Sequence, residues 1–226
     1  TIFEHNSHGL NQQLRLFVPR EDPLKIIELR LENRWKRQRR ITVTYYAEWV
    51  LGVNRDQMAP YIIPEYEHEH CALLARNPYM VEFAERVAFL TANQEPHGVT
   101  ADRTEFLGYN RSYRRPAALE RVGLSGTVQP GLDPCAAIQL HIDLEPGETR
   151  EISFLLGQSE SREMALHLME KYSTPESIHA AFDEVTSFWD DLLSTVQVAT
   201  PDPAMNIILN RWLLYQTLAC RIWGRA

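Results

Sequence analysis

One stretch of the chain concentrates side chains that can hold hydroxyl-rich ligands. Residues 100–119 read TADRTEFLGYNRSYRRPAAL, and between Asp102 and Arg115 they supply two acids, four arginines, two tyrosines and one asparagine. Carboxylates, amides and guanidinium groups form paired hydrogen bonds to adjacent hydroxyls, and aromatic rings stack on the apolar face of a pyranose. The stretch predicts a loop that contacts sugar or, equally, a loop that docks on another domain.

A second stretch, EYEHEHC at residues 65–71, suggests metal ligation. His68 and His70 would share one face of a strand, with Glu67, Glu69 and Cys71 close by. A zinc site needs a third or fourth ligand from elsewhere, and no partner motif accompanies this stretch. We interpret it as a solvated loop that runs into a strand, and we expect no metal site.

Catalytic groups are not identifiable from the sequence. Cys135, in LDPCAA, is accompanied by neither the base nor the electropositive setting that a catalytic thiol needs, so we expect a small buried core residue. No acid–base pair of carboxylates, phosphate-binding glycine loop or nucleophile elbow is apparent. We therefore expect no catalytic residue here. The basic run WKRQRR, residues 35–40, is expected to be a solvated hairpin tip rather than a binding patch.

Composition limits the class of protein. The chain has 226 residues, of which 44% are apolar, so it can form a sizeable core. Its formal net charge of −7 argues against nucleic acid as the main partner. The three cysteines are widely spaced and suggest neither a disulfide framework nor a zinc site. The sequence shows no signal peptide and no apolar run near the ~18 residues that a membrane span needs.

The elements that must position these residues are mostly strands. Apolar residues alternate in RRITVTYYAEWVLG, residues 39–52, which predicts a strand with one buried face. Residues 137–157, AIQLHIDLEPGETREISFLLG, predict a hairpin that turns at Pro146-Gly147. Further strands are expected within residues 10–18, 25–33, 71–77 and 86–93. The spacing indicates a large antiparallel β-sandwich over residues 1–158.

Helical periodicity follows, over residues 159–226. We expect helices capped by Ser161, by Thr174 with Pro175, and by Asp202 with Pro203. The last helix is apolar on nearly every side, which predicts burial against a domain outside these residues. The apolar positions that share one of its faces are Ile208, Trp212, Tyr215, Ala219 and Ile222.

Six motifs, taken in order, resemble the amino-side domain of the family-94 glycoside phosphorylases, formerly glycosyltransferase family 36. They are YAEWVLG, ARNPY, DRTEFLGYNRSYRRPAAL, GLDPCAAIQLHIDLEPGE, FLLGQ and NRWLLYQTLACRIWGRA. Within the family they are most similar to the phosphorylase-like region of cyclic β-1,2-glucan synthases. The resemblance covers most of the chain from Gly9 onward. It implies a mainly β super-sandwich with further strands before Thr1, then an α-helical linker, then an (α/α)6 barrel outside these residues.

The resemblance also implies a function. The intact enzyme would cleave a β-glucoside with inorganic phosphate as co-substrate and no other cofactor, using a general acid and a phosphate site in the barrel. This chain would be a non-catalytic domain that shapes the sugar cleft and packs on the barrel, or, alternatively, a purely structural or dimerisation domain without sugar contact. The expected partners are a β-glucan oligosaccharide, the barrel of the same polypeptide and a second copy of the protein. The expected location is cytoplasmic, with the parent protein attached to the inner membrane.

The matching polar motif positions are the predicted cleft or interface contacts. They are Glu48, Trp49, Arg76, Asn77, Asp102, Arg103, Arg111 and Arg114.

Overall fold

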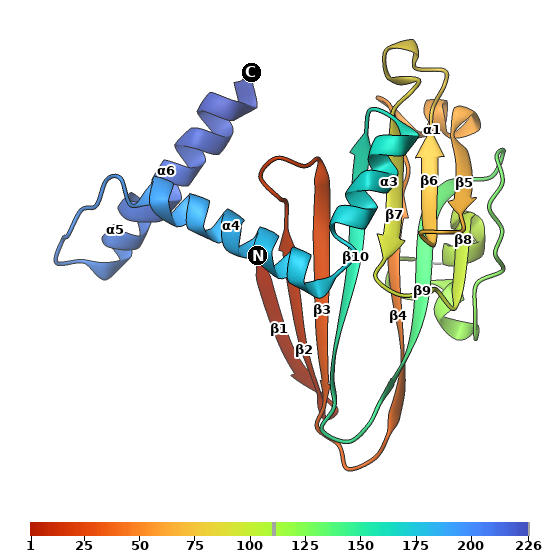
Figure 1. Ribbon diagram of the computed structural model, residues 1–226, viewed down its shortest axis with the longest axis horizontal. Helices are drawn as coiled ribbons and strands as arrows, with labels where there is room; N and C mark the ends of the chain where they lie inside the picture. Colours follow the sequence, from red (N-terminus) through yellow and green to blue (C-terminus); the bar gives the residue numbers. More distant parts are fainter. Residues whose placement is uncertain (110–111, 226) are drawn as a thin grey trace. The chain divides into compact units, whose positions relative to one another are not determined.

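The computed structural model describes residues 1–109 and 112–225. In them ten strands form two antiparallel sheets (Figure 1). The seven-stranded sheet has the order β1-β2-β3-β10-β7-β6-β5, and the three-stranded sheet has the order β4-β9-β8. Their bounds are β1 Ile2–Ser7, β2 Leu10–Phe17, β3 Leu24–Asn33, β4 Arg39–Glu48, β5 Ile63–Glu67, β6 Ala72–Arg76, β7 Val87–Ala92, β8 Gly98–Asp102, β9 Pro134–Leu144 and β10 Thr149–Ser159.

The core lies between the two sheets, where alternate residues of each strand point inward. Ile138, Leu140 and Leu144 of β9 pack against Ile152 and Phe154 of β10, and each is at most 2% exposed. Complete burial of such a side chain stabilises the fold by about 1.5–3 kcal/mol. The predicted mainly β sandwich with a helical part at its C-terminal end is confirmed.

The predicted hairpin over residues 137–157 is wrong in its pairing, although both strands exist. Strand β9 pairs with β4 in the small sheet, whereas β10 pairs with β3 and β7 in the large one. The turn at Pro146-Gly147 therefore carries the chain from one sheet to the other. Alternation within each strand gave the buried faces correctly, because it does not depend on which neighbour completes the sheet.

The basic run WKRQRR also connects the two sheets, so it is not the hairpin tip that we expected. It joins β3 to β4 beside the β9–β10 turn, and buried Asn33 fastens the two connections together. Its amide donates hydrogen bonds to the carbonyl oxygens of Arg37 at 2.9 Å, Leu144 at 3.1 Å and Glu145 at 3.2 Å. In a regular hairpin these three carbonyl oxygens would accept hydrogen bonds from the backbone of the partner strand. Here the Asn33 side chain supplies the donors instead.

Helix α3, Arg162–Lys171, packs on the outer face of the large sheet against β10 and β7. The side chain of Ser161 accepts a hydrogen bond from the Met164 N–H at 3.2 Å, so the predicted N-cap is confirmed. Helix α4, Pro175–Leu193, follows directly, and Thr174 Oγ1 accepts from the Ser177 N–H at 3.3 Å.

The short helices lie in the connections between strands. They are α1 Arg55–Met58, η1 Ala59–Tyr61, η2 Val81–Phe83, α2 Arg103–Leu107 and η3 Ala117–Glu120. We had interpreted residues 102–116 as a plain loop, yet the segment begins with α2. Asp102 Oδ1 accepts a hydrogen bond from the Thr104 N–H at 2.8 Å, and Gly108, with φ of +84°, ends the helix.

By contacts the chain divides into two compact units, Thr1–Ile178 and His179–Ala226, and each is described by itself. The predicted division between a sandwich and a linker at residue 158 stays a prediction. In the second unit, Asp202 caps the predicted third helix at Pro203. That helix runs as successive α- and π-helical segments, namely α5 Pro203–Ile207, η4 Ile208–Trp212, α6 Leu213–Gln216, η5 Thr217–Ile222 and a last 3-10 turn η6 Trp223–Arg225.

Within the second unit many large apolar side chains are exposed, including Ile207, Trp212, Ile222 and Trp223. Trp189 of α4 contacts the rings of Tyr215 and Trp223 at centroid distances of 5.1 and 5.5 Å. Across residues 1–109 and 112–225, no helix has both the length and the apolar character that crossing a membrane requires.

Candidate functional site

Glu48, the last residue of β4, is the centre of a polar network formed by several of the motifs. Its carboxylate accepts hydrogen bonds from Arg103 Nε at 2.7 Å, from the Tyr113 hydroxyl at 2.7 Å and from the Tyr46 hydroxyl at 2.8 Å. Arg55 Nε lies 3.2 Å from the same carboxylate, in a close ion pair that is not aligned as a hydrogen bond. Four side chains therefore converge on one acid.

Asp133 supplies a second carboxylate to the network. It pairs with Arg103 Nη1 at 3.3 Å and with Arg55. Each arginine thus bridges the two acids. We refer to Glu48, Arg55, Arg103, Tyr113 and Asp133 as the motif cluster.

Local backbone structure places these groups. Asp102 and Asn54 cap the short helices α2 and α1, so Arg103 and Arg55 each stand at the first helical position. The Arg103 N–H donates to the Asp133 carbonyl oxygen at 2.8 Å, which holds the start of α2 against the start of β9. The cluster is therefore fixed by caps and backbone bonds at the end of the small sheet.

The electrostatics of the cluster favour hydrogen bonding over proton transfer. Partial burial alone would raise the pKa of Glu48, but hydrogen bonds from Arg103, Tyr113 and Tyr46 outweigh it and lower the pKa to about 2. The hydrogen bond to Glu48 raises the pKa of Arg103 above its ordinary value. At neutral pH Glu48 is ionised, so it can accept hydrogen bonds from hydroxyl groups but cannot act as a general acid.

Aromatic rings surround the cluster. Tyr46 stacks on buried Phe106, with ring centroids 4.3 Å apart, and Tyr113 is tilted against Tyr46 at 6.4 Å. Tyr113 is 64% exposed and Tyr109 is 92% exposed. Both rings are accessible for stacking on a ligand or on a partner domain.

Three motifs, one of which also supplies Glu48 to the motif cluster, meet at a mainly apolar pocket of about 410 Å³. Leu51 and Gly52 come from YAEWVLG, Asn77 from ARNPY and Gln158 from FLLGQ, while Phe83 comes from η2. The segment 49–54 connects this apolar pocket to the motif cluster, because Glu48 and Arg55 flank it in sequence. Motifs far apart in the chain thus gather at adjoining places in the first unit.

Beside the apolar pocket, Tyr61 and Tyr79 stack with ring centroids 4.1 Å apart. They are 42% and 57% exposed, so together they present an aromatic surface to the outside.

The predicted contact residues have different places in the structure. Glu48 and Arg103 are together in the motif cluster, and Asp102 lies beside them as a helix cap. Trp49 is only 6% exposed and packs in the core, because the alternation of β4 carries it inward. Its predicted role as a cleft or interface contact stays a prediction.

Asn77 is buried and connects two loops. It donates to the Leu51 carbonyl oxygen at 2.8 Å and accepts from the Tyr79 N–H at 3.1 Å. Arg76 and Arg114 are exposed. Arg111 lies outside the described residues.

The histidine-rich stretch ends β5 and forms the turn that leads into β6, so the expected loop before a strand is present, and His68 and His70 do not share a strand face. Strand β5 ends at Glu67 because its carboxylate accepts hydrogen bonds from the N–H groups of Glu69 and His70, which bends the backbone into a turn. Glu67, Glu69 and His70 hold ligand atoms within 4.8 Å of one another. Two carboxylates and one imidazole at this spacing can contact a cation.

Cys135 is completely buried, as expected of a core residue. Burial raises the pKa of its thiol above the ordinary value, so the reactive thiolate is disfavoured.

Sequence inspection missed three members of the cluster. Asp133 and Tyr113 lie inside quoted motifs. Nothing in the sequence indicated that Tyr113 donates to Glu48 or that Asp133 shares Arg103 with Glu48. Arg55 lies outside the motifs. The capping asparagine before it, Asn54, was a signal that a helix starts there.

Comparison with known proteins gives two family matches. Residues 1–175 match the model described as glycosyl hydrolase 94, supersandwich domain, and residues 188–226 match the model described as glycosyl hydrolase 94 superfamily, catalytic domain.

Curated relatives agree with these matches. Cyclic beta-(1,2)-glucan synthase NdvB of Rhizobium meliloti (strain 1021) is 36% identical over 210 residues, which are 92% of this chain and 7% of that protein. N,N'-diacetylchitobiose phosphorylase of Vibrio proteolyticus is 24% identical over 99% of this chain and 28% of its own length. Solabiose phosphorylase of Paenibacillus borealis is 28% identical over 96% of this chain and 29% of its own length. The chain therefore spans less than a third of each of these relatives.

Proposed function

The chain belongs to glycosyl hydrolase family 94, and on that premise we propose that it is a non-catalytic part of an enzyme that acts on β-glucan with inorganic phosphate. In this proposal the motif cluster and the apolar pocket contribute to the sugar cleft. The convergence on Glu48 of three hydrogen bonds, two of them from the motif at residues 102–119, and of one ion pair with Arg55 carries the proposal.

The chemistry of the cluster supports sugar contact. An ionised carboxylate held by arginines accepts hydrogen bonds from sugar hydroxyls, and the exposed rings of Tyr109 and Tyr113 can stack on a pyranose. Buried tyrosines would brace a partner domain, whereas exposed rings are free to stack on a sugar. The exposure of both rings therefore supports sugar contact.

The same chemistry supports a non-catalytic role for the first unit. Glu48 is ionised at neutral pH and the Cys135 thiol is buried and protonated, so neither suits general-acid or nucleophilic catalysis. The proposal assigns the general acid and the phosphate site to an (α/α)6 catalytic barrel. Exposed apolar residues of the second unit, among them Trp212 and Ile222, are the proposed contacts with the rest of that barrel.

The β-1,2 linkage is the narrower part of the proposal, and it is supported by 36% identity to a protein named as a cyclic β-1,2-glucan synthase. A cytoplasmic location and self-association belong to the same proposal. Cell fractionation and sedimentation of the purified protein, respectively, would test them.

Calorimetric titration tests the proposal. Linear and cyclic β-1,2-glucans are titrated into the purified chain, with a β-1,4-linked oligosaccharide as the linkage control, and phosphate turnover is assayed on the same sample. Binding without turnover is the expected result. Turnover by the chain alone would contradict the non-catalytic role. Absence of binding would favour the alternative, a structural or dimerisation domain whose exposed rings of Tyr61, Tyr79, Tyr109 and Tyr113 contact only protein.

A further inference from the structure

The outer face of β1, β2 and β3 carries a polar groove apart from the motif cluster. In the strand register Asn6 lies opposite Asn11, which lies opposite Glu32. In the next row Glu4 lies opposite Gln13, which lies opposite Arg30. Leucines of β2 such as Leu14 and Leu16 pack against the core, so these six side chains occupy the face that points away from it.

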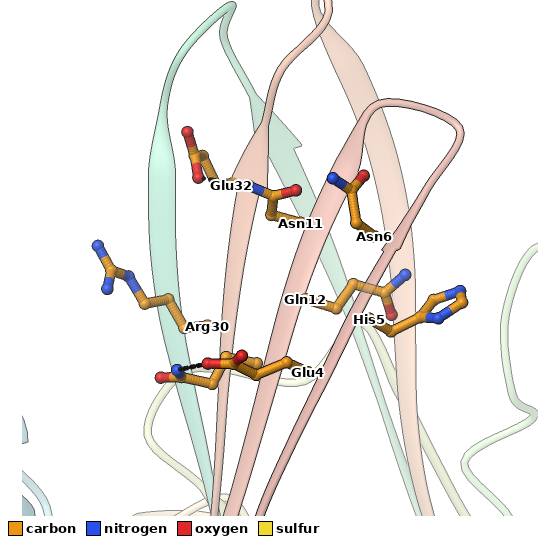
Figure 2. A pocket seen from close by; sticks show the side chains of 8 residues that line it. Glu4, His5, Asn6, Asn11, Gln12, Arg30 and Glu32 are labelled. Carbon is orange, nitrogen blue, oxygen red and sulfur yellow. Dashed lines mark hydrogen bonds between the residues drawn. The ribbon is translucent and has the colours of Figure 1, made fainter.

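The rows line a groove of about 440 Å³ (Figure 2). His5 and Gln12 also border it, although the register places their side chains on the other face of the sheet, and every described residue that lines it is polar. The two rows are separated by two residues along each strand, or about 7 Å at ~3.4 Å per residue. A lining without apolar side chains does not suit an apolar ligand or the apolar face of a helix.

Carboxylates outnumber guanidinium groups at the groove by one. Glu4 accepts a hydrogen bond from Gln13 at 2.8 Å, and Glu32 accepts from Asn11 at 2.9 Å and from Arg34 at 3.2 Å. Arg30 lies 3.9 Å from Glu151 of the neighbouring strand β10. A surface with this charge does not attract a phosphate, and a neutral ligand fits it better.

Hydrogen-bonding capacity remains after these internal bonds. Asn11 Oδ1 is shielded from solvent and has no hydrogen-bond partner in the described part of the chain, although its amide nitrogen is bonded to Glu32. A buried acceptor without a donor is costly, and a hydroxyl group can supply the missing donor. Amides present a donor and an acceptor side by side, which matches adjacent sugar hydroxyls.

We propose that the groove defined by Glu4, Asn6, Asn11, Gln13, Arg30 and Glu32 is a second binding site for a neutral glucan oligosaccharide. The choice of glucan as the sugar rests on the proposed function, whereas the site itself rests on the chemistry of the groove. Such a site would hold one stretch of a glucan chain on the sandwich while another stretch occupies the cleft.

The test is a titration of linear β-1,2-glucan into the wild-type chain and into the double variant Asn6→Ala/Gln13→Ala. Both positions are on the outer face, Asn6 in the edge strand β1 and Gln13 in the neighbouring strand β2, so the substitutions remove amide groups without opening the core. We expect two binding sites in the wild-type chain and one in the double variant, or about tenfold weaker binding at the groove. Hydrogen exchange should also slow in residues 2–17 of the wild-type chain when glucan is added.

The matched control is Gln38→Ala. It removes a similar exposed amide–carboxylate bond, from Gln38 to Glu145 at 2.8 Å, outside the groove. This variant should bind glucan as the wild type does. Unchanged stoichiometry and affinity in the double variant, with no slowing of exchange in β1 and β2, would overturn the inference.

Failure of this inference can be distinguished from failure of the proposed function. If Tyr113→Ala loses glucan binding and Asn6→Ala/Gln13→Ala does not, sugar contact at the motif cluster is supported and the groove site is overturned. If Asn6→Ala/Gln13→Ala loses binding and Tyr113→Ala does not, the groove site is supported and sugar contact at the motif cluster is contradicted.

Discussion

Replacing Glu48 with glutamine removes the negative charge on which the motif cluster is built. The pKa of Glu48 lies about 2.5 pH units below its ordinary 4.5, which corresponds to about 3 kcal/mol of differential stabilisation. The side chain retains 20% of its exposed area, so solvent screening lowers this to about 2 kcal/mol. The expected result is a free energy of unfolding lower by about 2 kcal/mol at pH 7, measured by urea denaturation.

The sign of the pH dependence follows from the lowered pKa. The charge on Glu48 contributes stability above pH 4.5, and this contribution is lost as the pH falls through about 2. The difference between wild type and Glu48→Gln should therefore fall to less than half by about pH 3. The control is Asp143→Asn, which breaks an exposed pair with Arg40 in the same sheet and should lower the free energy of unfolding much less than Glu48→Gln does. A Glu48→Gln cost below 0.5 kcal/mol, or one that stays constant with pH, would refute the reasoning.

Three further changes have defined outcomes. Gly9→Ala should lower the free energy of unfolding by at least about 2 kcal/mol, because φ is +70° and a Cβ would lie 1.9 Å from the Trp35 ring. Gly147→Ala is the control: φ is also positive but the space around it is open, so the free energy of unfolding should fall by only about 1 kcal/mol. Asp102→Ala should cost about 1 kcal/mol in urea denaturation through loss of the α2 cap, and no measurable loss would contradict that role. Burial lowers the pKa of His70, but hydrogen bonds with two glutamates outweigh it and raise the pKa. The advantage of wild type over His70→Gln in thermal melts should be complete below pH 6.5 and decline as the pH rises through the raised pKa, and a constant difference would contradict this.

The strands and helix caps could be predicted because their signals are local. The alternation of Ile138, Leu140 and Ile142 marks a buried face whatever the neighbouring strand is. Which strand pairs with β9 or β10 could not be inferred from local sequence. Whether the turn at Pro146-Gly147 closes a hairpin or crosses between sheets depends on Asn33, which is over one hundred residues away in sequence.

The candidate site could be predicted only in part for the same reason. Glu48 and Arg103 were found as motif residues, but their hydrogen bond depends on the β4–β9 register and on the Asp102 cap together. Arg55 carried no chemical signal of its own. Trp49 was predicted as a cleft or interface contact from its position in the motif YAEWVLG, whereas strand alternation continued past the end of β4 and carried it into the core.

The most direct measurement of the central claim is a calorimetric titration of linear β-1,2-glucan into the wild-type chain, Tyr113→Ala and Leu119→Ala. Tyr113 is an exposed ring bonded to Glu48, whereas Leu119 is an exposed side chain of the following segment without a ring. The account predicts that the wild-type chain and Leu119→Ala bind equally and that Tyr113→Ala binds about tenfold more weakly at the cleft site. Equal binding by all three proteins, or no binding by any, would contradict sugar contact at the motif cluster.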